Sequence, residues 1–498
     1  MSLFAKKSLQ SLMAQAAESE KGLKRTLSAG SLIALGIGAI IGAGLFVRTA
    51  AAAAQNAGPS VTLGFVVAAI GCALAGLCYA ELSSSIPIAG SAYTYSYATM
   101  GELIAWIIGW DLILEYAVGA ATVGIAWSEY LNNLLVNVLH WKAIPYEWCH
   151  SPFEHSIDGA HGFINLPALF IVSALTILLI RGTQESALVN GIIVIAKVAI
   201  VILIIIIGWQ FVNPANHTPY IPPSGTYTDH QGISHNFGGI AGILGAAGVV
   251  FFAFIGFDAV STAAQEAKNP KRDMPIGILG SLAICTVLYI LFAHVLTGVA
   301  TTEDFRTTGK EASVAFAINK YMIGYGWLGQ LVTIAILAGF SSVILVMLLG
   351  QSRVFYSMSK DGLLPATFSA IHPKYKTPHK ASLFVLILVG LFAAFVPGDV
   401  VGDMSSIGTL FAFMLVCAAV IVLRKTDPDL KREFKTPLVP FVPILGIIVC
   451  GAMIFGLGWT NWLRLIGWLV VGFIVYFGYS KKNSVVQKAL RGEKQDNV

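Results

Sequence analysis

Long apolar runs separated by short polar stretches make up most of the chain. A helix needs about 20 apolar residues to cross a bilayer, so these runs predict membrane-spanning helices. We expect twelve, at residues 30–55, 60–87, 101–136, 166–181, 186–211, 238–265, 275–301, 325–358, 380–397, 402–424, 438–458 and 461–480. The runs are too long for the strands of a β-barrel, which alternate over about 10 residues. The pattern therefore predicts an all-α integral membrane protein.

Composition and charge agree with this fold class and add an orientation. Of the 498 residues, 56% are hydrophobic and 11% are charged, against about 25% charged in soluble domains. Most lysines and arginines fall in loops on one side of the predicted bundle, which is the cytoplasmic side by the positive-inside rule. We therefore expect a cytoplasmic N-terminal segment at 1–26, a cytoplasmic tail at 481–498, and a location in the inner or plasma membrane of the cell.

Charge and cysteine usage exclude other kinds of partner. The net charge of +5 does not indicate a nucleic-acid partner, because the basic residues are dispersed over short loops. The six cysteines form no CxxC pair, and the histidines of the predicted outer loops, 140–165 and 212–237, show no regular spacing. We expect neither a metal site nor a disulfide framework.

The first predicted span contains four glycines within eleven residues: Gly36, Gly38, Gly42 and Gly44. Each costs a helix interior about 1 kcal/mol relative to alanine. One interpretation is a small-residue face against which another helix packs. The other is a helix that breaks in mid-membrane, which is tolerated only where the backbone lines a cavity or is buried in protein. The second half would then begin near Gly42 to Gly44, with free amides that suit a carboxylate.

The sixth predicted span is interrupted in a similar way, at Gly256 and Asp258. Breaks at corresponding places five spans apart are typical of transporters built from inverted repeats, with the substrate site between them. This predicts a first repeat at 27–213 (helices 1–5), a second at 238–424 (helices 6–10), and helices 11 and 12 within 438–480. Two unrelated glycine-tolerant helices are the alternative interpretation.

Ionisable residues inside a span are costly and indicate function. Lys197 lies deep in the fifth span with no acidic residue near it in the sequence. It could take up and release a proton, or it could be a permanently charged lysine that bridges carbonyl groups. Glu115 lies in the third span, where its carboxylate could meet a cationic group of a substrate or hydrogen-bond to a neighbouring helix.

Five motifs carry a resemblance to a known family: residues 36–46, 86–95, 101–116, 254–259 and 269–275. With them the chain resembles transporters of the amino acid–polyamine–organocation (APC) superfamily, and within it the bacterial relatives of the cationic amino-acid transporters. The resemblance implies twelve transmembrane helices, arranged as a 5+5 inverted repeat with broken helices 1 and 6, plus two C-terminal helices.

The resemblance also implies roles for single residues. Three amides would bind the substrate carboxylate, those of Gly42, Ala43 and Gly44. Four carbonyl groups would suit its ammonium, those of Ile40, Phe252, Ala253 and Ile255. Glu115 would line the central cavity, and Lys197 would stand where sodium-coupled relatives bind their ion. Met347 would line the side-chain pocket and shorten it, whereas Glu115 would favour a cation, so small neutral and cationic substrates both stay open.

Together these features predict a secondary active transporter that takes up an L-amino acid with protons by alternating access. An amino-acid or amine exchanger is the alternative, and an amino-acid sensor is a remote one. The loops show no nucleophile–base pair and no phosphate-binding motif, so we do not expect an enzyme. No cofactor is expected besides the coupling proton. The expected partners are the substrate and membrane lipid, and a small single-span auxiliary subunit is also allowed.

Overall fold

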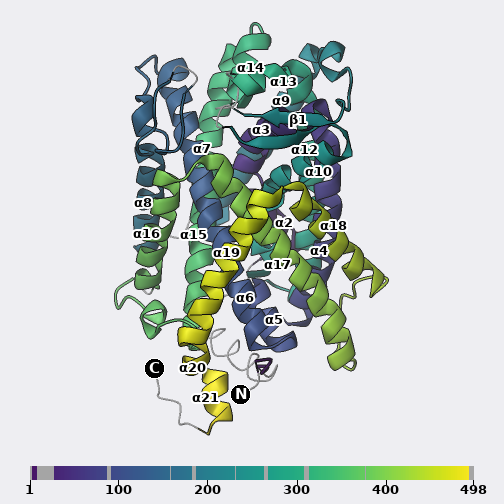
Figure 1. Ribbon diagram of the computed structural model, residues 1–498, viewed down its shortest axis with the longest axis vertical. Helices are drawn as coiled ribbons and strands as arrows, with labels where there is room; N and C mark the ends of the chain where they lie inside the picture. Colours follow the sequence, from purple (N-terminus) through teal and green to yellow (C-terminus); the bar gives the residue numbers. More distant parts are fainter. Residues whose placement is uncertain are drawn as a thin grey trace.

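In the computed structural model, the helices run side by side along the long axis of the molecule (Figure 1). The structure describes residues 3–7, 27–86, 91–156, 159–181, 187–229, 232–262, 267–307, 313–375 and 377–492. Most of the predicted N-terminal segment, at residues 1–2 and 8–26, therefore lies outside the described residues, as do residues 87–90 of one family motif and the end of the predicted tail. Residues 3–7 and the last helix, α21 (Val485–Leu490), lie at the same end of the bundle (Figure 1).

Most helices follow the predicted apolar runs. The uninterrupted ones are α4 (Val61–Ser85), α8 (Leu166–Ile180), α9 (Ala187–Gly208), α12 (Pro270–Val299), α15 (Gly326–Lys360), α16 (His379–Phe395), α17 (Gly398–Thr426), α18 (Phe441–Gly456) and α19 (Trp459–Val475). The third span is one helix with two π-helical stretches and consists of α6 (Glu102–Ile113), η4 (Leu114–Val118), α7 (Gly119–Asn133) and η5 (Leu134–Val138). Helix α8 covers nearly all of the fourth predicted run, 166–181.

Among the described residues, eight helices are long and apolar enough to cross a membrane, and four shorter apolar helices accompany them. The predicted all-α membrane fold is confirmed. The total of twelve spans and the limits of the two repeats stay predictions.

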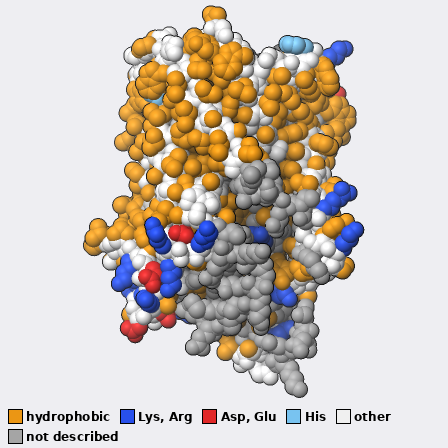
Figure 2. Space-filling view, turned by 180° about the vertical axis from the view of Figure 1, so that it is seen from behind, with side chains coloured by type: hydrophobic (Ala, Val, Ile, Leu, Met, Phe, Trp, Pro, Cys, Tyr) orange, Lys and Arg blue, Asp and Glu red, His pale blue; other side chains and the backbone are white. Residues whose placement is uncertain are grey.

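The outer surface of the bundle is apolar over most of its height. Figure 2 shows hydrophobic side chains covering one face, with lysine, arginine and acidic side chains gathered toward the end where the chain termini lie. Large apolar side chains are exposed along single helices, such as Ile466, Val470 and Ile474 of α19. In water such a surface would be unfavourable, so it marks the part of the molecule that faces lipid.

Several short elements have no counterpart in the predicted pattern. Helix α5 (Ser91–Thr99) precedes the third span, and a hairpin of β1 (Gly225–Thr228) and β2 (Ser234–Phe237) follows the fifth. At the end opposite the termini lie α13 (Thr302–Thr307) and α14 (Ser313–Tyr321) (Figure 1). These segments are short and mixed in polarity, so apolar periodicity does not reveal them.

The broken spans lie inside the bundle. Helix α12 packs along α4 and along α2 (Ala29–Ile40), the first half of the first span. Helix α10 (Gly239–Val250), the first half of the sixth span, packs on α4 and α18. Both breaks are therefore enclosed by protein, which is the condition under which irregular backbone survives at membrane depth.

Candidate substrate site at the two broken helices

The first span breaks where the glycines predicted it. Helix α2 ends at Ile40, Ile41 is extended (ψ 104°), and a π-helical turn, η1 (Gly44–Arg48), begins the second half. The first backbone hydrogen bonds of this half join the amides of Leu45 and Phe46 to the carbonyl of Gly42. The amides of Gly42, Ala43 and Gly44 therefore precede its hydrogen-bonded ladder, as the open amides of a helix N-terminus do.

The sixth span breaks in the same manner. Helix α10 passes into a 3₁₀ turn, η9 (Phe251–Phe254), and Ile255 is extended (ψ 135°). Gly256 has φ +109° and lies against the carbonyl of Ala39 in α2. The helix resumes as α11 (Ala259–Thr262). Only glycine adopts this backbone conformation readily, which explains the residue at the break.

The two breaks touch each other. A Cβ atom on Gly44 would lie 2.2 Å from the Cα atom of Ala253, so glycine is what allows the two backbones to approach. The hydroxyl of Tyr289, a fully buried residue of α12, lies 3.0 Å from the carbonyl oxygens of both Ile40 and Ala253. Tyr289 thus bridges the two breaks. Sequence reasoning missed it, because a single tyrosine in an apolar run gives no signal of its partners.

The predicted substrate residues gather at these breaks. Ile40, Gly42, Ala43 and Gly44 belong to the first break, and Phe252, Ala253 and Ile255 to the second. Two of the carbonyl groups expected to suit an ammonium group, those of Ile40 and Ala253, already share the single hydroxyl proton of Tyr289. Each oxygen has two lone pairs, so this bond leaves capacity for a second donor.

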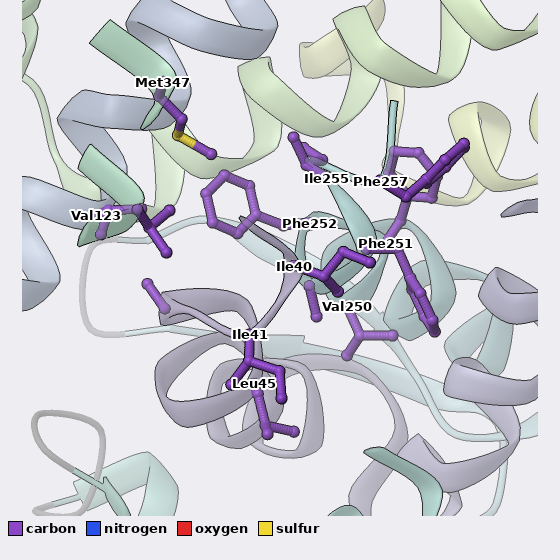
Figure 3. Close-up of a cluster of buried hydrophobic side chains, with 14 of the residues drawn as sticks. Ile40, Ile41, Leu45, Val123, Val250, Phe251, Phe252, Ile255, Phe257 and Met347 are labelled. Atoms are coloured by element: carbon purple, nitrogen blue, oxygen red, sulfur yellow. The ribbon is translucent and has the colours of Figure 1, made fainter. Parts of the chain in front are cut away.

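Apolar side chains pack together beside the breaks (Figure 3). The side chains of Phe252, Met347 and Val123 point toward one another (Figure 3). All three are buried, and the sulfur of Met347 also lies against the backbone of Gly119 on α7. The role of Met347 in lining and shortening a side-chain pocket stays a prediction. The arrangement favours an uncharged, apolar group next to the breaks.

Glu115 is buried in η4 and faces the break from the third span. Asp258 of the sixth span lies near it, and the Oδ2 atom of Asp258 accepts a hydrogen bond from the hydroxyl of Tyr116 at 2.6 Å. Glu115 and Asp258 are both fully buried. Both oxygens of the Glu115 carboxyl group lack a hydrogen-bond partner among the described residues, so the bond to a neighbouring helix and the contact with a substrate both stay predictions.

Lys197 reaches the first break from α9. Its Nζ atom donates a hydrogen bond of 2.9 Å to the carbonyl of Gly38, in the last turn of α2, and the side chain is 4% exposed. The stem of the lysine runs along α15 at Gly339, where a Cβ atom would lie 2.8 Å from its Cε atom. This bond to a carbonyl of the broken span fits both interpretations of Lys197, and its role in proton coupling stays a prediction.

A cavity of about 420 Å³ leads from Ala43 toward the end of the molecule opposite the termini. It is lined by the second half of the first span, α7, the loop after η5, β1, α13 and the start of α17. Arg48, on its wall, is 3% exposed and forms ion pairs with Asp399 and Asp403 of α17. Arg48 stands within the predicted first span, 30–55, and a pattern along one helix does not reveal the partners of its charge.

Comparison with known proteins agrees with this geometry. The family described as "Amino acid permease" matches residues 27–480. The chain is 45% identical to the branched-chain amino acid permease BcaP of Bacillus subtilis (strain 168), over 97% of this chain and 98% of that protein. It is 41% identical to the methylthioribose transporter of the same organism, over 98% of this chain and 100% of that protein. It is 34% identical to cationic amino acid transporter 4, vacuolar, of Arabidopsis thaliana, over 82% of this chain and 64% of that protein. The chain therefore belongs to the amino acid permease family of the APC superfamily, and it is a membrane transporter rather than an enzyme.

Proposed function

We propose that this protein takes up neutral, aliphatic L-amino acids together with protons, by alternating access. The observation that carries the proposal is the hydrogen bond from Lys197 to the carbonyl of Gly38, next to the break in the first span. A protonated lysine binds that carbonyl as a cation does. Loss of the proton removes the charge and weakens the bond, so protonation is linked to the position of α2.

The substrate class is argued from the wall of the site. An α-amino acid would place its carboxylate at the amides of Gly42, Ala43 and Gly44. These amides lie at the N-terminus of the second half-helix, which is the positive end of its dipole. Its side chain would then meet Phe252 and Met347, which are apolar and buried. The similarity to a branched-chain amino acid permease supports this class. Because the chain is also similar to a methylthioribose transporter, methylthioribose is an alternative substrate to test.

The orientation of the protein in the membrane sets the side from which the substrate enters. With the excess of lysine and arginine on the cytoplasmic side of a cell membrane, both termini are cytoplasmic and the cavity of about 420 Å³ opens to the outside. The described structure is then an outward-facing state, in which Ala43 is reached from outside.

We would test the proposal in proteoliposomes with an imposed inward proton gradient. Radiolabelled L-leucine, L-alanine, L-arginine and methylthioribose are offered to the wild type, to Lys197→Ala, and to Lys360→Ala, a control at an exposed lysine. We expect gradient-driven uptake of L-leucine and L-alanine by the wild type and the control. Lys197→Ala should lose the response to the gradient, with uptake at least about tenfold lower, the effect of about 1.4 kcal/mol.

Other results would favour other functions. Uptake that ignores the gradient but requires amino acid inside the vesicles would identify an exchanger and leave Lys197 a structural cation. Preference for L-arginine would overturn the apolar substrate class. Uptake of methylthioribose alone would replace the amino acid as the substrate.

A further inference from the structure

A row of polar side chains joins α19 to the wall of the cavity of about 420 Å³, which we call the outer cavity. Arg48 of the first span is held by Asp403 of α17. Asn461, in the first turn of α19, donates a hydrogen bond from Nδ2 to Oδ2 of Asp403 at 3.2 Å. The Oδ1 atom of Asn461 in turn accepts a hydrogen bond of 2.6 Å from Nη1 of Arg464. The row therefore runs from α19 through α17 to the first span.

The chemistry of this row requires an amide at position 461. The second donor of Nδ2 is also used, in a 2.8 Å bond to the carbonyl of Leu457. Asn461 thus gives two protons and accepts one, and it is only 4% exposed. A carboxylate at this position would have no proton for Asp403, and an apolar side chain would neither donate nor accept. A buried polar side chain is costly unless it is bonded in this way.

The row of polar side chains matters for transport because Arg48 lies on the wall of the cavity. Arg48 and Asp399 line the cavity that leads to Ala43, so the cavity widens or narrows as the first span moves relative to α17. Asp403 is partly exposed, at 17% of its side chain. Its second oxygen is the one that Asn461 binds, which leaves the first oxygen directed at Arg48.

We propose that Asn461 is a positioning residue for transport. It orients Asp403 toward Arg48 and thereby couples α19, which lies outside both predicted repeats, to the outer half of the first span. The inference rests on the proposed alternating access, because the ion pair matters for transport only if the first span and α17 change their separation during the cycle.

The test measures the opening of the cavity directly. Ala51 lines the cavity one turn beyond Arg48 and is 2% exposed. In the full-length protein carrying Ala51→Cys, the rate of labelling by a membrane-impermeant thiol reagent reports that opening, and the protein without Ala51→Cys gives the background from its native cysteines. Asn461→Leu removes all three hydrogen bonds of the amide. Asn461→Asp keeps the size of the side chain, removes both bonds that Nδ2 donates, and places a second carboxylate beside Asp403.

We expect both Asn461 variants to label about tenfold faster than the parent, the effect of losing one hydrogen bond to a charged group. Arg464→Gln, at a half-buried residue, should change the rate in the same direction by less. Thr460→Leu, at the exposed neighbour on the same helix, should leave it unchanged. Unchanged labelling in Asn461→Asp and Asn461→Leu would overturn the proposal.

A double-mutant cycle separates positioning from packing. If Asn461 acts through Asp403, then Asn461→Leu has no further effect once Asp403→Asn is present, on labelling or on uptake of L-leucine. Equal effects in both backgrounds would mean that Asn461 merely holds α19 in place. The labelling needs no substrate, so a wild type that takes up no amino acid would defeat the proposed function and still leave the coupling of α19 to Arg48 measurable.

Discussion

Tyr289 connects the two breaks through one hydroxyl group. Its oxygen lies 3.0 Å from the carbonyl oxygens of Ile40 and Ala253, which belong to different broken spans. Tyr289→Phe keeps the ring and removes this bridge, at a cost of about 1 kcal/mol for a buried neutral hydrogen bond. We therefore expect lower thermal stability and uptake reduced by about fivefold, measured on purified protein and in proteoliposomes.

The control for this change is Tyr325→Phe, which removes a hydroxyl from a half-buried tyrosine outside the broken segments. It should behave like the wild type. Equal uptake by Tyr289→Phe and wild type would show that the bridge is not needed during the transport cycle.

At the scale of the elements, the two broken helices approach each other closely at Gly44 and Ala253. A Cβ atom at position 44 would lie 2.2 Å from Cα and 2.5 Å from the amide nitrogen of Ala253, and both are backbone atoms. Gly44→Ala must therefore push η1 and η9 apart, at a cost of about 1–3 kcal/mol or more. We expect transport to be lost and the apparent melting temperature to fall, as seen by uptake and by thermal unfolding in detergent.

Gly467 of α19 offers the matched control. No atom lies within 4 Å of a Cβ atom built there, and the residue is exposed on the bundle surface. Gly467→Ala should be neutral or stabilising by up to about 1 kcal/mol, since alanine is the better helix former. If Gly44→Ala proved equally mild, the two backbones would have room that the structure does not give them.

At the scale of the whole molecule, a carboxylate holds together the end of the bundle opposite the termini (Figure 1). Asp304 of α13 accepts hydrogen bonds from Lys320 (2.5 Å) and Tyr321 (2.6 Å) of α14, and from both donors of Thr301 (2.9 and 2.6 Å). Burial alone would raise the pKa of Asp304, but these bonds outweigh it and hold the pKa well below its usual range. The charged form is therefore the one that stabilises the fold.

This sets the direction of a pH dependence. An aspartate whose pKa is lowered by folding contributes stability above its unfolded pKa of about 3.9, and that stability is lost as the pH falls through the lower folded value. We expect Asp304→Asn to melt earlier than the wild type at about pH 6, with a loss of about 1–3 kcal/mol. The difference should shrink as the pH is lowered toward about 3.

Exposed Asp429 supplies the comparison for this measurement, because Asp429→Asn removes a carboxylate at the surface. It should melt like the wild type throughout. A difference between wild type and Asp304→Asn that stayed constant with pH would mean that the carboxylate charge does not stabilise the packing of α13 against α14.

Much of the site could be predicted from short stretches of sequence. Four glycines within eleven residues indicated the first break, and Gly256 with Asp258 indicated the second. Lys197 stood out because a lysine in an apolar run is costly without a purpose. Each of these signals depends on residues within one helix, and that is the range over which apolar runs, glycines and buried charges can be recognised.

The sequence by itself thus determined the membrane fold class, the course of the long helices, the two breaks and the family. Only the tertiary structure decided which residues meet. Tyr289 bonds Ile40 across 249 positions, and Arg48 meets Asp403 across 355. Such contacts depend on how separate helices pack, and no pattern within a single helix encodes its neighbours. For this reason the bridge at the breaks, the ion pairs of Arg48 beside the cavity and the link to α19 emerged only from the structure.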